Sequence, residues 1–231
     1  MLIRTIAVVL LIACQKLWAG PLEDAKAAGT RGDYATSVQI LRPLAVMGNA
    51  IAQQWLGVSY QLGQGVAIDY AEALVWYRLS AAQGNADAQA CIGYMYRMGL
   101  GVGIDRKEAF KWFRLAAEQG NAVGEFDVGS AYASGDGIAK NFVEAARWYR
   151  MAAVQGNDVA QCSLGEMYYE GQGLKRDLAR AYMWLSLGRS SPSAHDFVSL
   201  DTVAKSMTEE QVETAQKMAL ECQDRKFRNC E

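Results

Sequence analysis

The chain has 231 residues, of which 51% are hydrophobic and 21% charged, and its formal net charge at pH 7 is −2. This composition is typical of a globular protein with enough apolar side chains for one elongated domain or one and a half compact ones. Because lysine and arginine are not in excess, the sequence lacks the electrostatic footprint of a nucleic-acid-binding protein, and no basic run indicates binding to an anionic membrane surface.

The first 19 residues have the features of an export signal. Arg4 precedes an apolar run over residues 6–13, which is shorter than the roughly 20 residues that span a bilayer but suits the centre of a secretory signal. Cleavage after Ala19 would release a soluble chain. Alternatively, residues 11–14 resemble a bacterial lipobox, in which Cys14 would be acylated, and an uncleaved anchor is the third possibility. In each case we expect the mature chain outside the cytoplasm, periplasmic or secreted or held as a lipoprotein, and we expect no membrane span beyond the signal.

From residue 48 onwards the sequence repeats with a period of 36 residues. A Gly-Asn pair recurs without slippage at residues 48, 84, 120 and 156. A column of tryptophans keeps the same register, at Trp76, Trp112, Trp148 and Trp184. A fixed period of this size indicates a solenoid, in which helical units stack on one another. Within the first copy, the spacing of apolar residues predicts one helix over 50–62 and a second over about 70–83.

Each copy carries a glycine cluster between its two predicted helices, such as residues 99–103. A cluster of this kind binds phosphate when it joins a strand to a helix, but it then occurs once in a chain. Here the first two glycines recur in all four copies, and each time Asp or Asn follows before the next helix. We therefore interpret the glycines as the left-handed ends of the first helices, and the Asp or Asn as the N-cap of the second helices.

Two further columns are interpreted as packing positions. Glycine inside a helix costs roughly 1 kcal/mol relative to alanine, so its recurrence at Gly57 and the equivalent positions indicates helices that approach each other closely. The tryptophan column shares a helix face with alanines, and we expect its rings to wedge between helices rather than to form a sugar-stacking platform. Burial would then stabilise the array by roughly 1.5–3 kcal/mol for each ring.

The repeat resembles a known family. Its pattern, A-x-A-Q-x-x-L-G-x-x-Y-x-x-G-x-G-V-x-x-D-x-x-x-A-x-x-W-Y-x-x-A-A-x-x-G-N, is similar to the Sel1-like repeat, a relative of the tetratricopeptide repeat. Residues 50–82 and 86–117 match it closely, the copy over 122–153 departs at Gly124, Glu125 and Val128, and the copy over 158–189 loses the final A-A-x-x-G-N. The resemblance covers roughly residues 32–190 and implies an all-α fold, a right-handed αα-superhelix (solenoid) of about four and a half helix-turn-helix repeats.

The repeats are expected to occupy residues 49–189, between two caps, because a solenoid exposes apolar surface at its ends unless something covers it. Residues 20–48 are expected to form an N-terminal cap or half repeat, and residues 190–231 a C-terminal helical cap. In the second cap, Thr208 begins a capping box ahead of a helix that runs to about Cys222. A disulfide between Cys222 and Cys230 would hold the tail, contributing roughly 2–3 kcal/mol. Cys91 and Cys162 fall in different columns and are expected to be free, buried thiols.

Side chains that could carry catalysis are scarce. The single histidine, His195, lies in a Ser/Pro-rich junction without a nucleophile turn nearby, and no group of histidines or cysteines has metal-ligand spacing. We therefore expect no catalytic residue, no cofactor and no metal, and a protein that is not an enzyme. The resemblance leaves one alternative, a secreted Sel1-like protein that binds or hydrolyses β-lactams, although the chain has no S-x-x-K and no K-T-G motif.

The candidate binding residues lie on the side of the first helices that points away from the packed face. At 100° per residue, positions 51, 55, 58 and 62 cluster there, and the resemblance implies that the first helices line a groove. The candidates are Ile51, Trp55, Val58, Leu62, Asp87, Tyr94, Met98, Asp127, Glu166 and Glu170. Along the chain they change from apolar to acidic, which predicts an apolar and an acidic end of the groove. Alternatively, the helix that contains Ile40 and Leu41 folds over Trp55 and Leu62 as a cap.

Together these features predict a non-enzymatic protein–protein interaction module in the bacterial cell envelope. It would bind a protein partner in the groove, as a scaffold or regulator or as an immunity protein that neutralises a periplasm-targeted toxic effector such as a lipase. The resemblance permits the second role, because some exported Sel1-like proteins have it. An acidic groove end would suit a basic partner surface.

Overall fold

The computed structural model describes residues 20–190, 197–227 and 230. The predicted export signal, including Cys14, and His195 lie outside the described residues. Within the described ranges the regular elements are helices, and no strand occurs there. A helix over residues 20–30 comes first. It is followed by α2 (Tyr34–Val46), α3 (Ala50–Leu62), α4 (Tyr70–Ala81), α5 (Ala86–Met98), α6 (Arg106–Ala117), α7 (Ala122–Ser134), α8 (Phe142–Ala153), α9 (Asp158–Glu170), α10 (Leu178–Leu187), the 3-10 helix η1 (Gly188–Ser190), α11 (Leu200–Ala204) and α12 (Glu209–Asp224).

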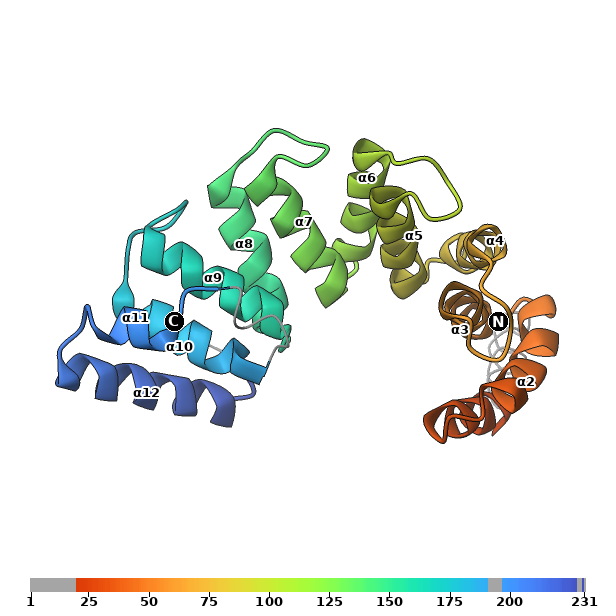
Figure 1. Ribbon diagram of the computed structural model, residues 1–231, viewed down its shortest axis with the longest axis horizontal. Coiled ribbons are helices and arrows are strands. Elements are labelled where there is room, and N and C mark those ends of the chain that lie inside the picture. Colours follow the sequence, from red (N-terminus) through yellow and green to blue (C-terminus); the bar gives the residue numbers. More distant parts are fainter. Residues whose placement is uncertain (1–19, 191–196, 228–229, 231) are drawn as a thin grey trace, which may run out of the picture. The chain divides into compact units, whose positions relative to one another are not determined.

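Consecutive helices pack against one another within two compact units of the chain (Figure 1). One unit ends at Ile104 and the other begins at Asp105. In the first unit α2 packs on α3, α3 on α4, and α4 on α5. In the second, α6 packs on α7, α7 on α8, α8 on α9, and α9 on α10. These contacts join the two helices of one repeat and also neighbouring repeats, which confirms the predicted all-α solenoid.

Each helix of the repeats begins at an Asn or Asp that caps it. The first helices begin after Asn49, Asn85, Asn121 and Asn157, whose side chains accept a hydrogen bond from the backbone N–H three residues on. The second helices begin after Asp69, Asp105, Asn141 and Asp177, which accept in the same way. Each cap satisfies an N–H group that a helix N-terminus leaves unpaired. The predicted caps of the second helices are confirmed, and the caps of the first helices are a further role of the Gly-Asn pair.

The glycine clusters are turns that bring two repeats together. The first glycine ends the first helix in the left-handed conformation, with φ of 71° at Gly63 and 72° at Gly99. The second glycine, such as Gly101, also has a positive φ and lies against the start of the second helix of the preceding repeat. A Cβ on Gly101 would lie 2.7 Å from the carbonyl carbon of Tyr70. Glycine is therefore needed for the backbone conformation and for the close approach, and the interpretation of the clusters as turns is confirmed.

In the first and third repeats, the ring that fills the helix pair comes from the residue after the tryptophan. Tyr77 and Tyr149 are 0% and 7% exposed, whereas Trp76 and Trp148 are half-buried. Successive residues of a helix point about 100° apart, so Tyr77 faces α3 while Trp76 packs against the apolar cluster of the preceding helices. The prediction that the tryptophan column forms the core therefore holds fully only for Trp184.

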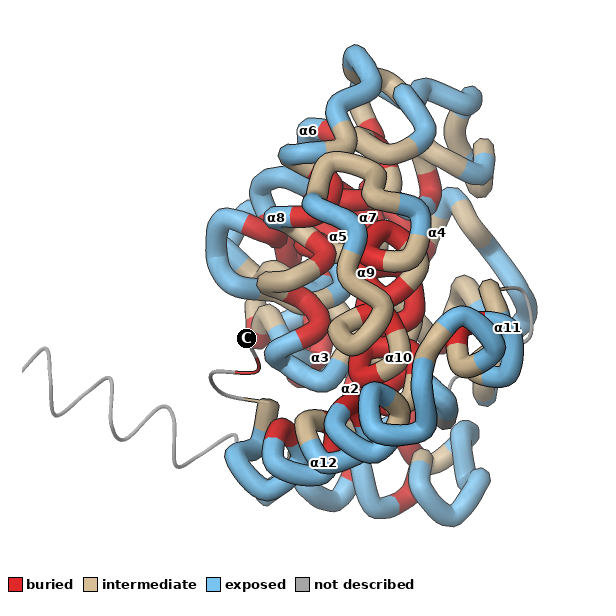
Figure 2. Tube along the Cα trace, turned by 90° about the vertical axis from the view of Figure 1, so that its left-hand side faces the viewer, coloured by how far each residue is buried: buried red, intermediate tan, exposed pale blue. Residues whose placement is uncertain are grey.

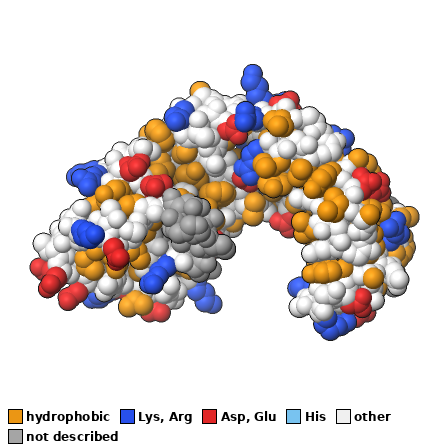
Figure 3. All heavy atoms as spheres, in the orientation of Figure 1, with side chains coloured by type: hydrophobic (Ala, Val, Ile, Leu, Met, Phe, Trp, Pro, Cys, Tyr) orange, Lys and Arg blue, Asp and Glu red, His pale blue; other side chains and the backbone are white. Residues whose placement is uncertain are grey.

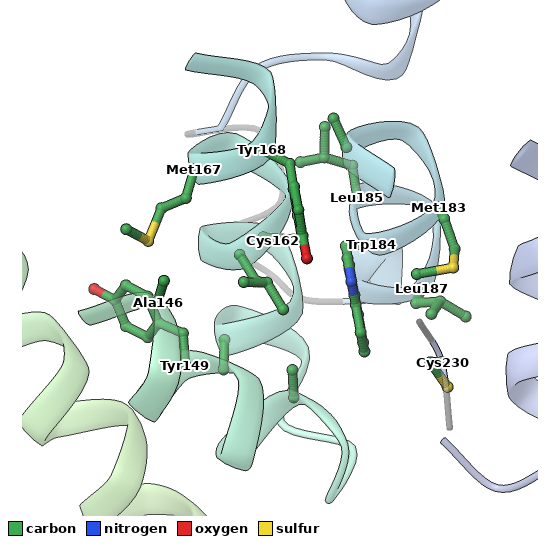
Figure 4. Packing of buried hydrophobic residues seen from close by; sticks show 14 of the residues in the cluster. Ala146, Tyr149, Cys162, Met167, Tyr168, Met183, Trp184, Leu185, Leu187 and Cys230 are labelled. Carbon is green, nitrogen blue, oxygen red and sulfur yellow. The ribbon is translucent and has the colours of Figure 1, made fainter. Parts of the chain in front are cut away.

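Trp184 is buried because the C-terminal helices pack on α10. It is 1% exposed, and α10 contacts both α11 and α12. Figure 4 shows Trp184 beside Leu187 and Cys230 in this core. Cys222 and Cys230 form a disulfide, with their Cα atoms 5.1 Å apart, which is the pairing that the sequence predicts.

The first and the last of the described helices expose mainly polar side chains and bury small or apolar ones. The helix over residues 20–30 buries Ala25 and Ala28 and exposes Lys26. Thr208 and Gln211 form the predicted capping box at the start of α12, whose exposed side chains are mostly polar. Figure 2 shows how buried and exposed stretches alternate along the helices. Among the described residues, no helix has the length and apolar character needed to cross a bilayer.

Candidate protein-binding surface

The candidate residues of the first unit lie on α3 and α5, and most of them are accessible. Ile51 and Leu62 on α3 are 46% and 55% exposed, and Tyr94 and Met98 on α5 are 37% and 52% exposed. Three further candidates belong to the same two helices, namely Trp55 and Val58 on α3 and Asp87 on α5. Together these seven residues form what we call the first-helix surface: Ile51, Trp55, Val58, Leu62, Asp87, Tyr94 and Met98. In Figure 3, hydrophobic side chains gather over the part of the molecule formed by α3, α4 and α5.

A cation packs on the aromatic ring of α5. The Arg97 guanidinium lies over the Tyr94 ring, 5.5 Å from its centroid. Cys91, which comes one helical turn before Tyr94, is half-buried, and burial raises the pKa of its thiol to about 11. The thiol therefore stays protonated at neutral pH and has the character of a small apolar group rather than that of a nucleophile.

A pocket of about 370 Å³ adjoins the first-helix surface, and we call it the end pocket. Its walls come from three elements: the helix over residues 20–30, α2 and α3. Its main lining residues are Lys26, Tyr34, Ser37, Leu41, Trp55 and Val58. Trp55 and Val58 are half-buried and belong both to this pocket and to the first-helix surface.

The sequence predicts the α3 wall as a binding surface and the α2 wall as the alternative cap. Residues 20–48 are interpreted as an N-terminal cap or half repeat, and Lys26 is not among the candidate residues. Gly29 stands 36 residues before Gly65, and this spacing was a signal that another helix precedes α2. The capping alternative holds in part, because the buried Leu41 lies beside Trp55 in the pocket wall. Leu62, in contrast, stays exposed, so α2 does not cover the whole surface.

The acidic end of the predicted groove is largely covered. Asp127 on α7 is 5% exposed and Glu166 on α9 is half-buried, while Glu170 at the end of α9 is exposed. Asp127 is therefore not available to a partner, contrary to the prediction. The Asp127 side chain also interacts with other groups of the protein.

The Tyr149 side chain lies near the buried Asp127. This side chain comes from α8, and its hydroxyl hydrogen-bonds to Ser130 on α7 and to Ser163 on α9. Burial and, to a smaller extent, the nearby carboxylates of Asp127 and Glu166 raise the pKa of Tyr149 to about 12, although the interactions with Ser130 and Ser163 oppose the rise. The predicted groove requires open space between neighbouring first helices. Between α7 and α9, however, the Tyr149 side chain of α8 lies next to Ser130 and Ser163.

The chain after α10 covers the face of α9 that carries Glu166. Phe197, Val198 and Leu200 pack against the same apolar cluster as the side chains of α9. Burial raises the pKa of Glu166, and the neighbouring Glu170 raises it too, whereas a hydrogen bond from the Val198 backbone lowers it. The predicted change from an apolar to an acidic groove is thus present in the sequence, but of its acidic residues in the second unit only Glu170 is exposed.

The second free thiol, Cys162, is also a packing group. It is 1% exposed, and its Sγ donates to the Gly188 carbonyl oxygen at 3.3 Å. Burial raises its pKa to about 11, so it is not activated at neutral pH. In the residues that the structure describes, no three His, Cys, Asp or Glu side chains are grouped so that they could hold a metal ion.

Comparison with known proteins identifies the repeat. The family model described as the Sel1 repeat matches residues 50–85, 86–121, 122–157 and 158–189. The chain belongs to the Sel1 repeat family. Sel1 repeats are generally modules for protein–protein interaction.

Solved structures of other proteins resemble this Sel1 repeat protein. A Sel1 repeat protein from Oxalobacter formigenes is 34% identical, with a TM-score of 0.64, over 71% of this chain and 48% of its own length. This chain thus spans about half the length of that protein. Immunity protein Pa5087 from Pseudomonas aeruginosa is 17% identical, with a TM-score of 0.50, over 86% of this chain and 81% of its own, a likeness of fold alone. The protective antigen c5321 of uropathogenic Escherichia coli is 23% identical, with a TM-score of 0.42, over 91% of this chain and 62% of its own. No match was found among curated proteins.

Proposed function

We propose that this Sel1 repeat protein is a non-enzymatic protein–protein interaction module that binds its partner through the first-helix surface. The observation that carries the proposal is the exposure of four large apolar side chains at the outward positions of two neighbouring first helices, namely Ile51, Leu62, Tyr94 and Met98. Exposed apolar side chains that gather on one surface mark interaction sites. Aromatic anchors such as Tyr94 carry much of the binding energy in many interfaces.

The proposed location is the bacterial cell envelope, either periplasmic or secreted, with a lipoprotein acylated at Cys14 as the alternative. This part of the proposal rests on the pattern of residues 1–19. Two narrower roles fit the surface: a scaffold or regulator, and an immunity protein that neutralises a periplasm-targeted toxic effector such as a lipase. The fold is compatible with the second role, because Pa5087, which is described as an immunity protein, has a similar fold. The identity of the captured partner distinguishes the two roles: a toxic effector would indicate an immunity protein, and another envelope protein would indicate a scaffold or regulator.

The test is capture of a partner from a cell-envelope extract with the tagged full chain and with the double variant Tyr94→Ala/Met98→Ala. Because both side chains are exposed, we expect the variant to keep the melting temperature of the wild type. We expect it to bind the captured partner more than about fivefold less tightly, which corresponds to about 1 kcal/mol.

Leu79→Ala is the matched control for this experiment. Leu79 lies on α4 in the same unit and is 46% exposed, but it is not part of the first-helix surface. The control should retain the partner as well as the wild type does. A partner that Tyr94→Ala/Met98→Ala retains as tightly as the wild type would contradict the proposed surface.

A further inference from the structure

The end pocket has an apolar floor within a defined volume. Leu41 is 1% exposed, and the half-buried Trp55 and Val58 stand next to it in the lining. The pocket measures about 370 Å³, which lies within the range of protein pockets that enclose a small group. It therefore has room for one large apolar side chain of a partner, whereas the rest of the first-helix surface offers exposed side chains.

A single charge stands at this pocket. Of the described residues that line it, Lys26 is the one with a charged side chain, and it is exposed. Its ammonium group forms no ion pair with another residue in the described part of the chain. Tyr34 and Ser37 add hydroxyl groups to the wall formed by α2. An apolar floor beside an unpaired cation complements a group that is apolar at one end and carries a carboxylate at the other.

Two walls of the pocket are held in place by the repeat architecture. Gly65, which has a φ of 75°, packs so closely on the start of α2 that a Cβ on it would lie 2.6 Å from the Tyr34 carbonyl carbon. The Gln53 side chain of α3 donates to the Ala45 carbonyl oxygen of α2 at 3.0 Å. Asp33 caps α2 by accepting from the Thr36 N–H at 3.1 Å. Because α2 and α3 are already tied together, binding would cost little additional ordering of these walls.

We propose that the end pocket sets the specificity of the first-helix surface, and that it recognises an apolar side chain next to an Asp or Glu in a segment of the protein partner. This inference rests on the proposed function. Trp55 and Val58 belong to both regions, so one segment of the partner can contact the pocket and the surface together. The inference reverses the charge that the sequence alone led us to expect in the partner. Asp127 and Glu166 are covered in the second unit, whereas the accessible Lys26 adjoins the apolar wall.

A random peptide library displayed on phage is the probe for this pocket. The library is selected against the immobilised full chain, and the enriched peptides are synthesised and measured by fluorescence anisotropy. We expect enriched peptides to carry a large apolar residue beside Asp or Glu. Lys26→Glu should weaken their binding by at least about fivefold, because a repulsive pair replaces an attractive one. Selection against Lys26→Glu should favour Lys or Arg at the position where the wild type favours an acid.

Lys217→Glu is the matched control, because it reverses an exposed charge on α12, in the other unit, and should leave peptide binding unchanged. Peptides whose binding is insensitive to Lys26→Glu but is lost in Tyr94→Ala/Met98→Ala would overturn the inference and leave the proposed function standing. Enrichment without an acidic preference, or no enrichment, would also overturn it. The proposed function is judged separately, by capture of the partner with the Tyr94→Ala/Met98→Ala variant.

Discussion

One buried position of the first helices shows how a single residue changes the hydrogen bonding of a repeat. In the first repeat, Gln53 donates through Nε2 to the Ala45 carbonyl oxygen at 3.0 Å and accepts from Gln83 at 2.8 Å. Gln161 donates to the Ala153 carbonyl oxygen in the same way, also at 3.0 Å. The third repeat has Glu125 at this position, 2% exposed, and the Gln155 Nε2 donates to its Oε2 at 2.7 Å. An ionised carboxylate accepts this bond but has no hydrogen to donate to the carbonyl of the preceding repeat.

We therefore predict that Glu125→Gln stabilises the protein at pH 7. The amide can accept from Gln155 and also donate to the backbone carbonyl, and one such hydrogen bond contributes about 1 kcal/mol. Burial raises the pKa of Glu125 in the folded state, although the Gln155 hydrogen bond opposes the rise. A carboxyl whose pKa is raised in the folded state binds a proton more readily in the folded protein than in the unfolded chain. The Glu125 side chain therefore destabilises the folded protein less as the pH falls. The gain from Glu125→Gln should thus shrink as the pH is lowered through this raised pKa.

The measurement is the free energy of unfolding by urea at a series of pH values from 7 down to about 4, near the ordinary pKa of glutamate. Glu213→Gln, which removes one exposed carboxylate from α12, controls for the change in net charge. A variant that is no more stable than the wild type at pH 7, or one whose gain is equal at every pH, would contradict the account of Glu125.

At the scale of the element, the helix pairs of the first and third repeats depend on a missing Cβ. A Cβ on Gly57 in α3 would lie 2.6 Å from the Tyr77 ring of α4, and a Cβ on Gly129 in α7 would lie 2.7 Å from the Tyr149 ring of α8. The Tyr77 hydroxyl also donates to the Gln61 Oε1 at 2.6 Å, so the ring is anchored at its far end. The glycine and the ring therefore form one packing unit, which sets how closely the two helices of a repeat approach.

We predict that Gly57→Ala destabilises the protein by up to about 2 kcal/mol. Overpacking against the Tyr77 ring costs about 1–3 kcal/mol, whereas alanine in place of glycine gains about 1 kcal/mol of helix propensity. Gly103→Ala is the control, since a Cβ there has no neighbour within 4 Å and the backbone is not left-handed. Urea unfolding of both variants provides the comparison. If Gly57→Ala and the wild type had the same free energy of unfolding, the prediction would be contradicted, because the two helices would then move apart without loss of stability.

At the scale of the whole molecule, the chain divides into two units, and the boundary along the sequence lies between Ile104 and Asp105. This boundary lies inside the second repeat, between α5 and α6, although the sequence period continues across it. In a solenoid each repeat contacts mainly its neighbours, so local stability differs along the chain. A perturbation in one unit should therefore be felt most strongly in that unit.

We predict that Gly57→Ala and Gly129→Ala affect different parts of the chain. Both variants place a methyl group against an aromatic ring of the second helix, one in the first unit and one in the second. Native-state hydrogen exchange should show reduced protection of α2–α5 in Gly57→Ala and of α7–α10 in Gly129→Ala. Loss of protection that extends equally over all helices in both variants would mean that the chain unfolds as one cooperative unit.

The sequence alone determined the features of this protein that depend on neighbouring residues. The 36-residue period, the Asp and Asn caps of the second helices and the left-handed glycines could be predicted, because each is set by the chemistry of a few adjacent residues. The all-α class followed from the same local signals.

Only the tertiary structure decided which side chains are buried and which are accessible. Trp76 and Tyr77 are adjacent in the sequence, and the position of α3 determines that Tyr77 fills the helix pair. Asp127 is buried in a region where the Tyr149 side chain of α8 lies beside α7 and α9. Lys26 reaches the end pocket because the helix over residues 20–30 packs beside α2 and α3. Burial depends on elements that are distant along the chain, so no local pattern of residues specifies it. For this reason the candidate site in the structure differs from the predicted one, whereas the fold agrees with the prediction.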